Sequence, residues 1–400
     1  MRLGVLKEFI YFWSFSITLV GVVFSRLYGL GLGNVSAFLC YMIFIVLYTK
    51  GAALKKIKFG LVMRLALLFF ILAVGSIMVQ KHISGSLLDR QGFDTYEFAI
   101  NNLIITFIYF LFGMIAVFAT STYLKTKGIL LVLVTLIFGA AIGRGVIDYE
   151  AISARIGSNV GQIEISQSFV VIVLLALAYS RRYKMTVIII GSVLLFIAGS
   201  RTAFFLGAAT MLFYAGAVGS VSRRMAVILG SILAMSFFLA FFDLGSNPLL
   251  SRMLLTEGFA GDSSAQSRLR QVELGFRGLQ EQLIIGDMNF VVDQFGGIGF
   301  YIHNIFGYWQ QYGGIVFFLV CLILFLICKK GKKDFITIQS FDHPFYTFRL
   351  LMLVYTILAV LVSMSYTFKF LWFMVGLYCV NVNQNKRVFL PNRLIYMAKI

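Results

Sequence analysis

The chain has 400 residues, of which 60% are hydrophobic and 12% are charged, and its formal net charge at pH 7 is +18. Soluble globular proteins carry about 25% charged residues. A soluble domain of this length is therefore excluded, and the composition indicates a membrane protein.

Apolar segments recur along the whole chain, and most of them are long enough to cross about 30 Å of hydrocarbon as a helix. They predict an all-α polytopic membrane protein with about twelve transmembrane helices in one integral membrane domain, residues 1–400. The expected spans are 9–25, 33–49, 60–80, 99–119, 128–146, 166–180, 185–199, 202–218, 225–245, 307–328, 349–366 and 369–384. The first is predicted to be a retained signal anchor, because no small-residue cleavage site separates it from the second.

Basic runs fall at every second connection between these spans, and cytoplasmic loops are the ones that carry an excess of Lys and Arg. The runs lie at 50–58, 125–127, 181–184, 223–224 and 329–333. Both termini are therefore predicted to be cytoplasmic, in a bacterial inner membrane. With this topology the cytoplasmic side has a net charge of +20 and the outer side −2, so the charge of +18 reflects topology and indicates no nucleic-acid partner.

The sequence indicates neither a disulfide framework nor a metal site. All four cysteines, Cys40, Cys321, Cys328 and Cys379, lie in expected spans. No Asp-x-Asp motif is present, so there is no obvious carboxylate pair for a divalent metal that would hold a nucleotide sugar. Positive side chains would have to neutralise a leaving diphosphate instead.

Three outer segments exceed the usual length of a connection, and long loops usually carry function. They are residues 81–98, 147–165 and 246–306, the last being a large periplasmic loop. This loop contains an apolar stripe with helical spacing, Leu269, Val272, Phe276, Leu279 and Leu283, opposite a charged face of Arg270, Glu273, Arg277 and Glu281. The pattern predicts an amphipathic helix on the outer surface or over a cavity; the alternative is that the helix only roofs the bundle.

The basic residues of the outer side are nine Arg and two Lys, whereas those of the inner side are nine Arg and fourteen Lys. A topogenic charge can be either residue, but only a guanidinium gives bidentate contacts to phosphate or carboxylate. The bias indicates an outer cavity that binds a diphosphate.

Two residues of the outer side are candidates for chemistry. Arg201 follows Gly199-Ser200 between two apolar spans, and a guanidinium at membrane depth costs about 3 kcal/mol unless it faces a cavity; the alternative is an anchor to lipid phosphate. His303 lies where the large loop returns to the membrane, and is either a general base or a structural hydrogen-bonding residue. The alternative bases are Glu257, Asp262, Asp287 and Asp293.

Taken in order, several short motifs between about residues 150 and 330 resemble the O-antigen polymerase and ligase superfamily. They are Arg155-Ile156-Gly157-Ser158-Asn159, Gly199-Ser200-Arg201-Thr202-Ala203, an Arg-bearing helix from Arg268 and Arg270 to Gly286, His303-Asn304, and Tyr312-Gly313-Gly314. The usual Asn-Pro-Asn of the family's outer loop is absent.

The resemblance implies a C-type glycosyltransferase-like membrane enzyme, independent of metal, that uses undecaprenyl-diphosphate-linked glycans. It implies His303, Arg201 and Arg270 as catalytic residues and Arg155, Arg268, Arg277 and Asn304 as substrate-binding residues. A polymerase of lipid-linked repeat units is the favoured activity, with membrane lipid and a chain-length regulator protein as further partners. The alternatives are a ligase that transfers glycan to lipid A core, and a polysaccharide flippase or transporter.

Overall fold

The computed structural model describes residues 60–85, 87, 94–122, 167, 170–178, 184, 187–188, 191–192, 195, 201–218, 263–290, 302, 304–340, 344–362 and 368–379. The elements of this part of the chain are α-helices. They are α3 (Leu61–Ser84), α4 (Thr95–Thr122), α9 (Arg201–Val218), α13 (Ser263–Glu281), α15 (Phe306–Tyr312), α16 (Gly314–Ser340), α17 (Pro344–Val362) and α18 (Lys369–Cys379).

Four helical segments in the described residues are long and apolar enough to cross a membrane, so the chain is an all-helical membrane protein. They are Leu61–Ser84, Thr95–Met114, Gly314–Gln339 and Pro344–Val362, and Thr202–Ala217 and Lys369–Cys379 are shorter apolar helices. The spans predicted at 60–80, 99–119, 202–218, 349–366 and 369–384 each overlap a helix. The spans predicted at 9–25, 33–49, 128–146 and 225–245 lie outside the described residues, and 166–180 and 185–199 are described only in part.

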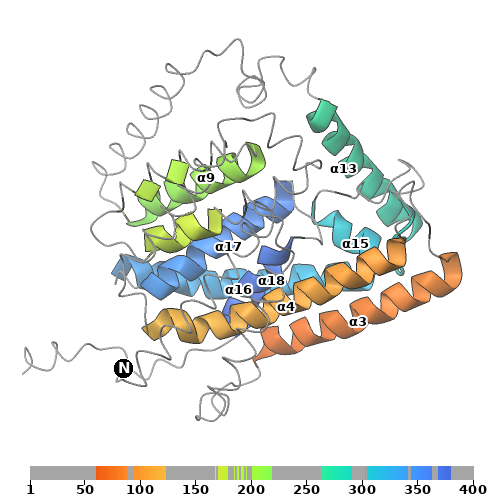
Figure 1. Cartoon of the computed structure of the whole chain (residues 1–400), viewed down its shortest axis with the longest axis horizontal. Helices are drawn as coiled ribbons and strands as arrows, with labels where there is room; N and C mark the ends of the chain where they lie inside the picture. Colours follow the sequence, from red (N-terminus) through yellow and green to blue (C-terminus); the bar gives the residue numbers. More distant parts are fainter. Residues whose placement is uncertain are drawn as a thin grey trace, which may run out of the picture.

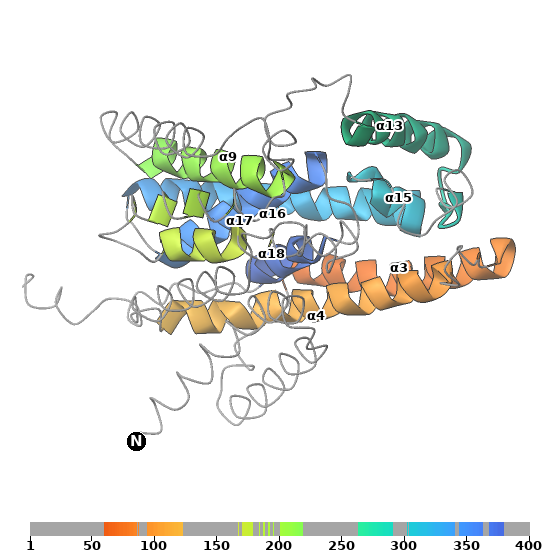
Figure 2. The same ribbon diagram turned by 45° about the horizontal axis from the view of Figure 1, so that its top comes forward.

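The long helices lie side by side along the longest axis of the molecule, and α13 is oblique to them (Figures 1 and 2). The chain turns from α3 into α4 at the end where α13 and α15 lie, which we call the α13 end. It turns from α16 into α17 at the opposite end.

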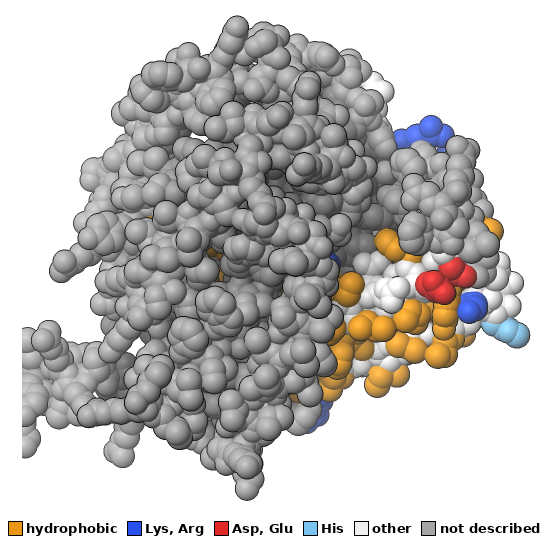
Figure 3. Space-filling model, viewed as in Figure 1, with side chains coloured by type: hydrophobic (Ala, Val, Ile, Leu, Met, Phe, Trp, Pro, Cys, Tyr) orange, Lys and Arg blue, Asp and Glu red, His pale blue; other side chains and the backbone are white. Residues whose placement is uncertain are grey.

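Apolar side chains that face away from the bundle follow the helical repeat. On α16 they are Ile315, Phe318, Leu322 and Phe325, and on α3 they include Leu61, Leu68, Ile71 and Met78. Steps of three, four and seven residues place each set on one side of its helix, as expected of surfaces that face lipid. In Figure 3 hydrophobic side chains cover part of the visible described surface, while acidic, basic and histidine side chains lie together at its right-hand end.

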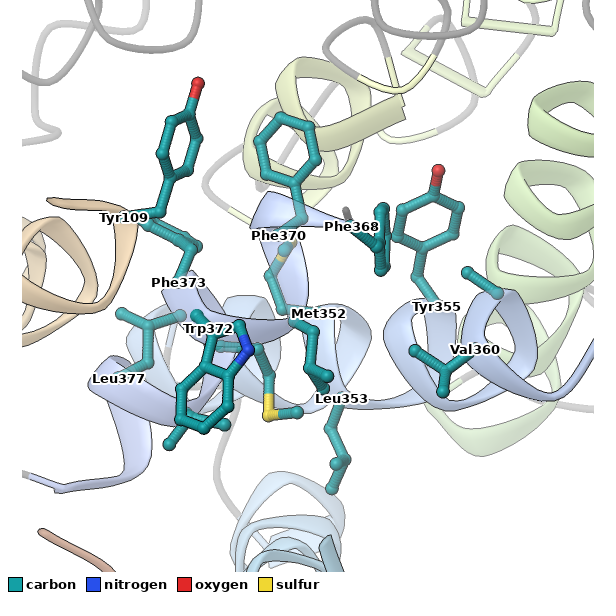
Figure 4. Packing of buried hydrophobic residues seen from close by; sticks show 14 of the residues in the cluster. Tyr109, Met352, Leu353, Tyr355, Val360, Phe368, Phe370, Trp372, Phe373 and Leu377 are labelled. Carbon is teal, nitrogen blue, oxygen red and sulfur yellow. The ribbon is translucent and has the colours of Figure 1, made fainter. Parts of the chain in front are cut away.

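Aromatic rings fill the centre of the bundle around Trp372 of α18. Its ring centroid lies 4.0 Å from that of Phe69 and 4.9 Å from that of Phe70, and its indole N–H donates to the Tyr308 hydroxyl at 3.0 Å. Figure 4 shows α18 side chains between Tyr109 of α4 and the side chains of α17. A Cβ on Gly113 or Gly376 would overlap backbone atoms of the other helix, so these glycines let α4 and α18 approach closely.

The structure differs from the sequence expectation in two places along residues 306–340. The single span predicted at 307–328 is divided, because Gly313 adopts a φ of +88° and ends α15 before α16 begins. The basic run at 329–333 is not a connection but part of α16. At about 1.5 Å per residue this helix is about 40 Å long, so it extends beyond the hydrocarbon and carries these lysines past it.

Candidate functional site at the α13 end

Three glycines join the turn after α13 to the α15–α16 junction, and we call this contact the glycine clasp (residues 283–287 and 309–314). Gly286 and Gly313 both have positive φ values, +76° and +88°. A Cβ on Gly286, Gly313 or Gly314 would overlap backbone atoms of the facing segment. The N–H of Gly314 donates to the Ile284 carbonyl and the N–H of Asp287 to the Gln310 carbonyl, both at 3.0 Å. The clasp therefore holds the end of α13 against the membrane helices.

Gln80 connects α3 to the same clasp. Its Nε2 donates to the carbonyls of Ile285, at 3.0 Å, and Gln311, at 3.1 Å, and its Oε1 accepts from the Met288 N–H at 2.7 Å. Thr95 at the start of α4 donates to Asn289 Oδ1 at 2.8 Å. Segments that are about 200 residues apart in the sequence are thereby brought together at one end of the bundle.

The side of α13 that packs on the bundle contains two glycines. Gln271, Leu274, Gly275 and Gly278 are its buried positions. A Cβ on Gly278 would overlap the Trp309 indole, whose N–H donates to the Gln282 carbonyl at 2.9 Å. The two glycines thus let α13 lie directly on α15.

The predicted amphipathic helix is confirmed, and its charged side faces solvent. Arg270, Glu273 and Arg277 are exposed, and Arg277 Nη2 lies 3.6 Å from Glu273 Oε1, as the four-residue spacing of these side chains predicts. The apolar stripe does not form the buried side. Leu269, Phe276 and Leu283 are exposed, whereas Val272 and Leu279 are half-buried and Leu279 packs against the core.

Of the predicted site residues, the structure brings Arg270, Arg277 and Asn304 to the α13 end. Asn304 is buried, and its Oδ1 accepts from the Phe306 N–H at 2.9 Å, which satisfies a backbone donor at the start of α15. Arg155 and His303 lie outside the described residues, as do the side chains of Arg201 and Arg268.

The backbone of Arg201 is described, and the N-terminal end of its helix α9 is directed toward the α13 end. Phe213 of α9 lies against Phe335 in the last part of α16, with ring centroids 6.1 Å apart. Since α9 lies alongside α17 (Figures 1 and 2), its first residue lies nearer the α13 end, about 18 Å along the helix from Phe213.

No family model matches the chain, and neither a curated protein nor a solved structure matches it.

Chemically, the α13 end offers guanidinium groups on an exposed face beside buried amides. Gln310 Oε1 and Gln311 Nε2 are buried and have no hydrogen-bond partner among the residues that the structure describes. Buried polar atoms normally have partners, so both are available to a bound polar group or water. Among the described residues no three His, Cys, Asp or Glu side chains gather to hold a metal ion.

Sequence reasoning missed Gln80, Asn289, Gln310 and Gln311. Gln80 ends an apolar span, and a polar side chain inside a span usually faces the protein interior, so its position was the available signal. For Asn289 nothing in the local pattern indicates that Thr95, at the start of a distant helix, is its partner.

A second polar cluster, which the sequence analysis also missed, lies at the opposite end. Arg349 of α17 donates to both carboxylate oxygens of Asp334 on α16, with Nε at 2.7 Å from Oδ2, and both side chains are buried. The Tyr378 hydroxyl donates to the Arg349 carbonyl at 3.4 Å, and Lys330 Nζ donates to the Tyr378 carbonyl at 2.9 Å. These bonds fasten α16, α17 and α18 to one another.

Proposed function

We propose that the chain is a membrane glycosyltransferase, an O-antigen polymerase that joins undecaprenyl-diphosphate-linked oligosaccharide repeat units at the periplasmic face of the inner membrane. One observation carries the proposal. Four motif segments that lie between residues 263 and 314, on separate elements, meet at the α13 end: the Arg-bearing helix α13, Gly286, Asn304 and Tyr312-Gly313-Gly314.

The charges at this end suit a diphosphate leaving group. Negative charge develops on the diphosphate as the glycosidic bond breaks, and guanidinium forks stabilise it by charge-assisted, bidentate hydrogen bonds. Arg270 and Arg277 are exposed here, and Lys81 in the last turn of α3 lies 3.8 Å from the Tyr96 ring centroid. Arg201, Arg155 and Arg268 are proposed to complete the set, without a metal ion.

The acceptor side of the reaction needs a base and polar contacts. His303 is proposed as the general base, because an imidazole takes up a proton near neutral pH. It directly precedes Asn304, whose side chain fixes the start of α15. Gln310 and Gln311 are proposed to contact the polar glycan through the side-chain atoms that have no partner.

The test is the length of polymer made in a deletion strain that carries variants of the gene. Arg270→Lys should lose nearly as much polymer as Arg270→Ala, because an ammonium lacks the bidentate fork. His303→Ala should lower the rate by about 10² to 10⁴. Arg64, exposed near the start of α3 at the opposite end, supplies the matched control, and Arg64→Ala should leave polymer unchanged.

Other outcomes identify other functions. Near-normal polymer from both Arg270→Lys and His303→Ala, at equal protein levels, contradicts the mechanism. In the deletion strain, one repeat unit on the lipid A core is expected of a missing polymerase. Bare core with lipid-linked polymer indicates a ligase, and single units retained inside the cell indicate a flippase.

A further inference from the structure

Seen along its axis, α13 has three sides. One packs on α15 through Gln271, Leu274, Gly275 and Gly278, and one carries the exposed charges of Arg270, Glu273 and Arg277. The third is the apolar stripe, in which Leu269 is 72% exposed, Phe276 52% and Leu283 53%. At about 100° per residue the stripe lies between the other two sides. The helix therefore presents an apolar side to something other than the described part of its own bundle.

This apolar side is continuous with the lipid-facing side of α16. The turn after α13 carries two exposed side chains, Ile284 and Ile285, and the Ile284 carbonyl accepts from the Gly314 N–H at 3.0 Å. The next residue of α16, Ile315, is exposed and begins the lipid-facing row that continues with Phe318. On α13 itself the Phe276 ring lies 4.7 Å from that of Phe306. An apolar surface thus runs from the side of a membrane-spanning helix onto α13.

An apolar surface of this kind is unfavourable in water. Burying a large aliphatic or aromatic side chain is favourable because it removes apolar area from water, and contiguous apolar patches usually mark contact with a membrane or a partner. A helix with one apolar side and a basic side beside it is the pattern of an interfacial helix, whose apolar side enters the boundary between headgroups and acyl chains. Arg270 and Arg277 are positioned to meet lipid phosphates.

We propose that α13 lies in the lipid–water interface, with Leu269, Phe276 and Leu283 among the acyl chains and Arg270 and Arg277 at the level of the headgroups. The occupant of the apolar side is the bilayer, because the exposed Ile284 and Ile285 continue this side to Ile315, at the start of the lipid-facing row of α16. The inference does not depend on the proposed enzymatic activity. It places the exposed arginines at the depth where the phosphate groups of any membrane lipid lie.

Spin labels on the full-length protein in phospholipid vesicles test this. In a variant without the four native cysteines, labels are placed by Leu269→Cys, Phe276→Cys, Glu273→Cys and Arg277→Cys, with Phe318→Cys as the lipid-facing reference. Collision with oxygen, which concentrates in lipid, is compared with collision with a water-soluble nickel chelate. The labels at 269 and 276 should match the label at 318, at a depth of about 5–10 Å. The labels at 273 and 277 should favour the chelate.

Two results would overturn the proposal. If the label at 276 collides with the chelate as often as the label at 273, the apolar side faces water. If it is shielded from both oxygen and chelate, a protein surface covers the stripe. Thermal midpoints equal to that of the unlabelled parent establish that each labelled protein is folded, and polymerase activity does not enter either result.

Discussion

At the scale of single residues, Gly286 adopts a backbone conformation that favours glycine over any residue with a side chain. Its φ of +76° costs a residue with a side chain about 1–2 kcal/mol, and a Cβ would overlap the Trp309 carbonyl and the backbone of Gly313. We expect Gly286→Ala to open the clasp and lower the thermal midpoint of the purified protein, measured by scanning fluorimetry in detergent.

Gly75 of α3 provides the control, since a Cβ there would meet nothing within 4 Å. Gly75→Ala should be neutral or stabilising by up to about 1 kcal/mol, because alanine loses less backbone entropy than glycine in a helix. Equal midpoints for the two alanine variants would show that the clasp does not determine stability.

Asn304 shows how a residue in a functional motif also has a local structural role. The resemblance implies that it binds substrate, whereas in the structure its Oδ1 accepts from the Phe306 N–H. Both roles are compatible, because the amide group also has an NH₂ that can donate.

At the scale of elements, Gln80 joins α3 to the clasp. Gln80→Leu would leave the Ile285 and Gln311 carbonyls and the Met288 N–H without this partner, at about 1–3 kcal/mol for each group left unsatisfied. We expect hydrogen exchange at residues 283–290 to become faster in the variant. Val79→Leu, at an exposed neighbouring position, is the control, and its hydrogen exchange should match that of the parent. Unchanged exchange in Gln80→Leu would contradict the role of Gln80 in holding α3 to the clasp.

The buried ion pair of Asp334 and Arg349, at the end opposite α13, leads to a second prediction at the scale of elements. Breaking a buried pair leaves an uncompensated charge and costs about 3–5 kcal/mol, so Asp334→Asn should lower the unfolding midpoint strongly. The double variant Asp334→Leu with Arg349→Met should recover much of the loss, because no buried charge remains. Lys332→Gln, at an exposed position two residues before Asp334, should change little. A double variant no better than Asp334→Asn would contradict this account.

At the scale of the whole molecule, the structure separates α13 from the lysines of α16 by the length of a membrane-spanning helix. Glu273→Cys and Lys332→Cys are both at exposed positions and should react with a membrane-impermeant thiol reagent from opposite faces. In vesicles of defined orientation, we expect position 273 to be labelled from the periplasmic face and 332 from the cytoplasmic face. Labelling of both from one face would overturn the predicted topology.

Composition and hydropathy were sufficient to determine the helical membrane class, because a bilayer requires each span to satisfy its backbone within one continuous apolar helix. For the same reason five of the predicted spans each overlap a described helix. The amphipathic helix was also predictable, since the spacing of Leu269, Val272 and Phe276 depends only on the helical repeat.

Only the tertiary structure decided which side of α13 is buried. The apolar stripe is the obvious candidate, but Gly278 lets α13 approach Trp309 and Gly275 lets it approach Phe306. Hydrophobic periodicity gives no signal for a contact that depends on a missing side chain. The division of the span predicted at 307–328 could not be predicted either. A positive φ at Gly313 does not interrupt the apolar run in the sequence. The pairing of Gln80 with Ile285 and of Asp334 with Arg349 depends on how the helices pack. These contacts join different segments of the chain, so the sequence around either partner does not predict them.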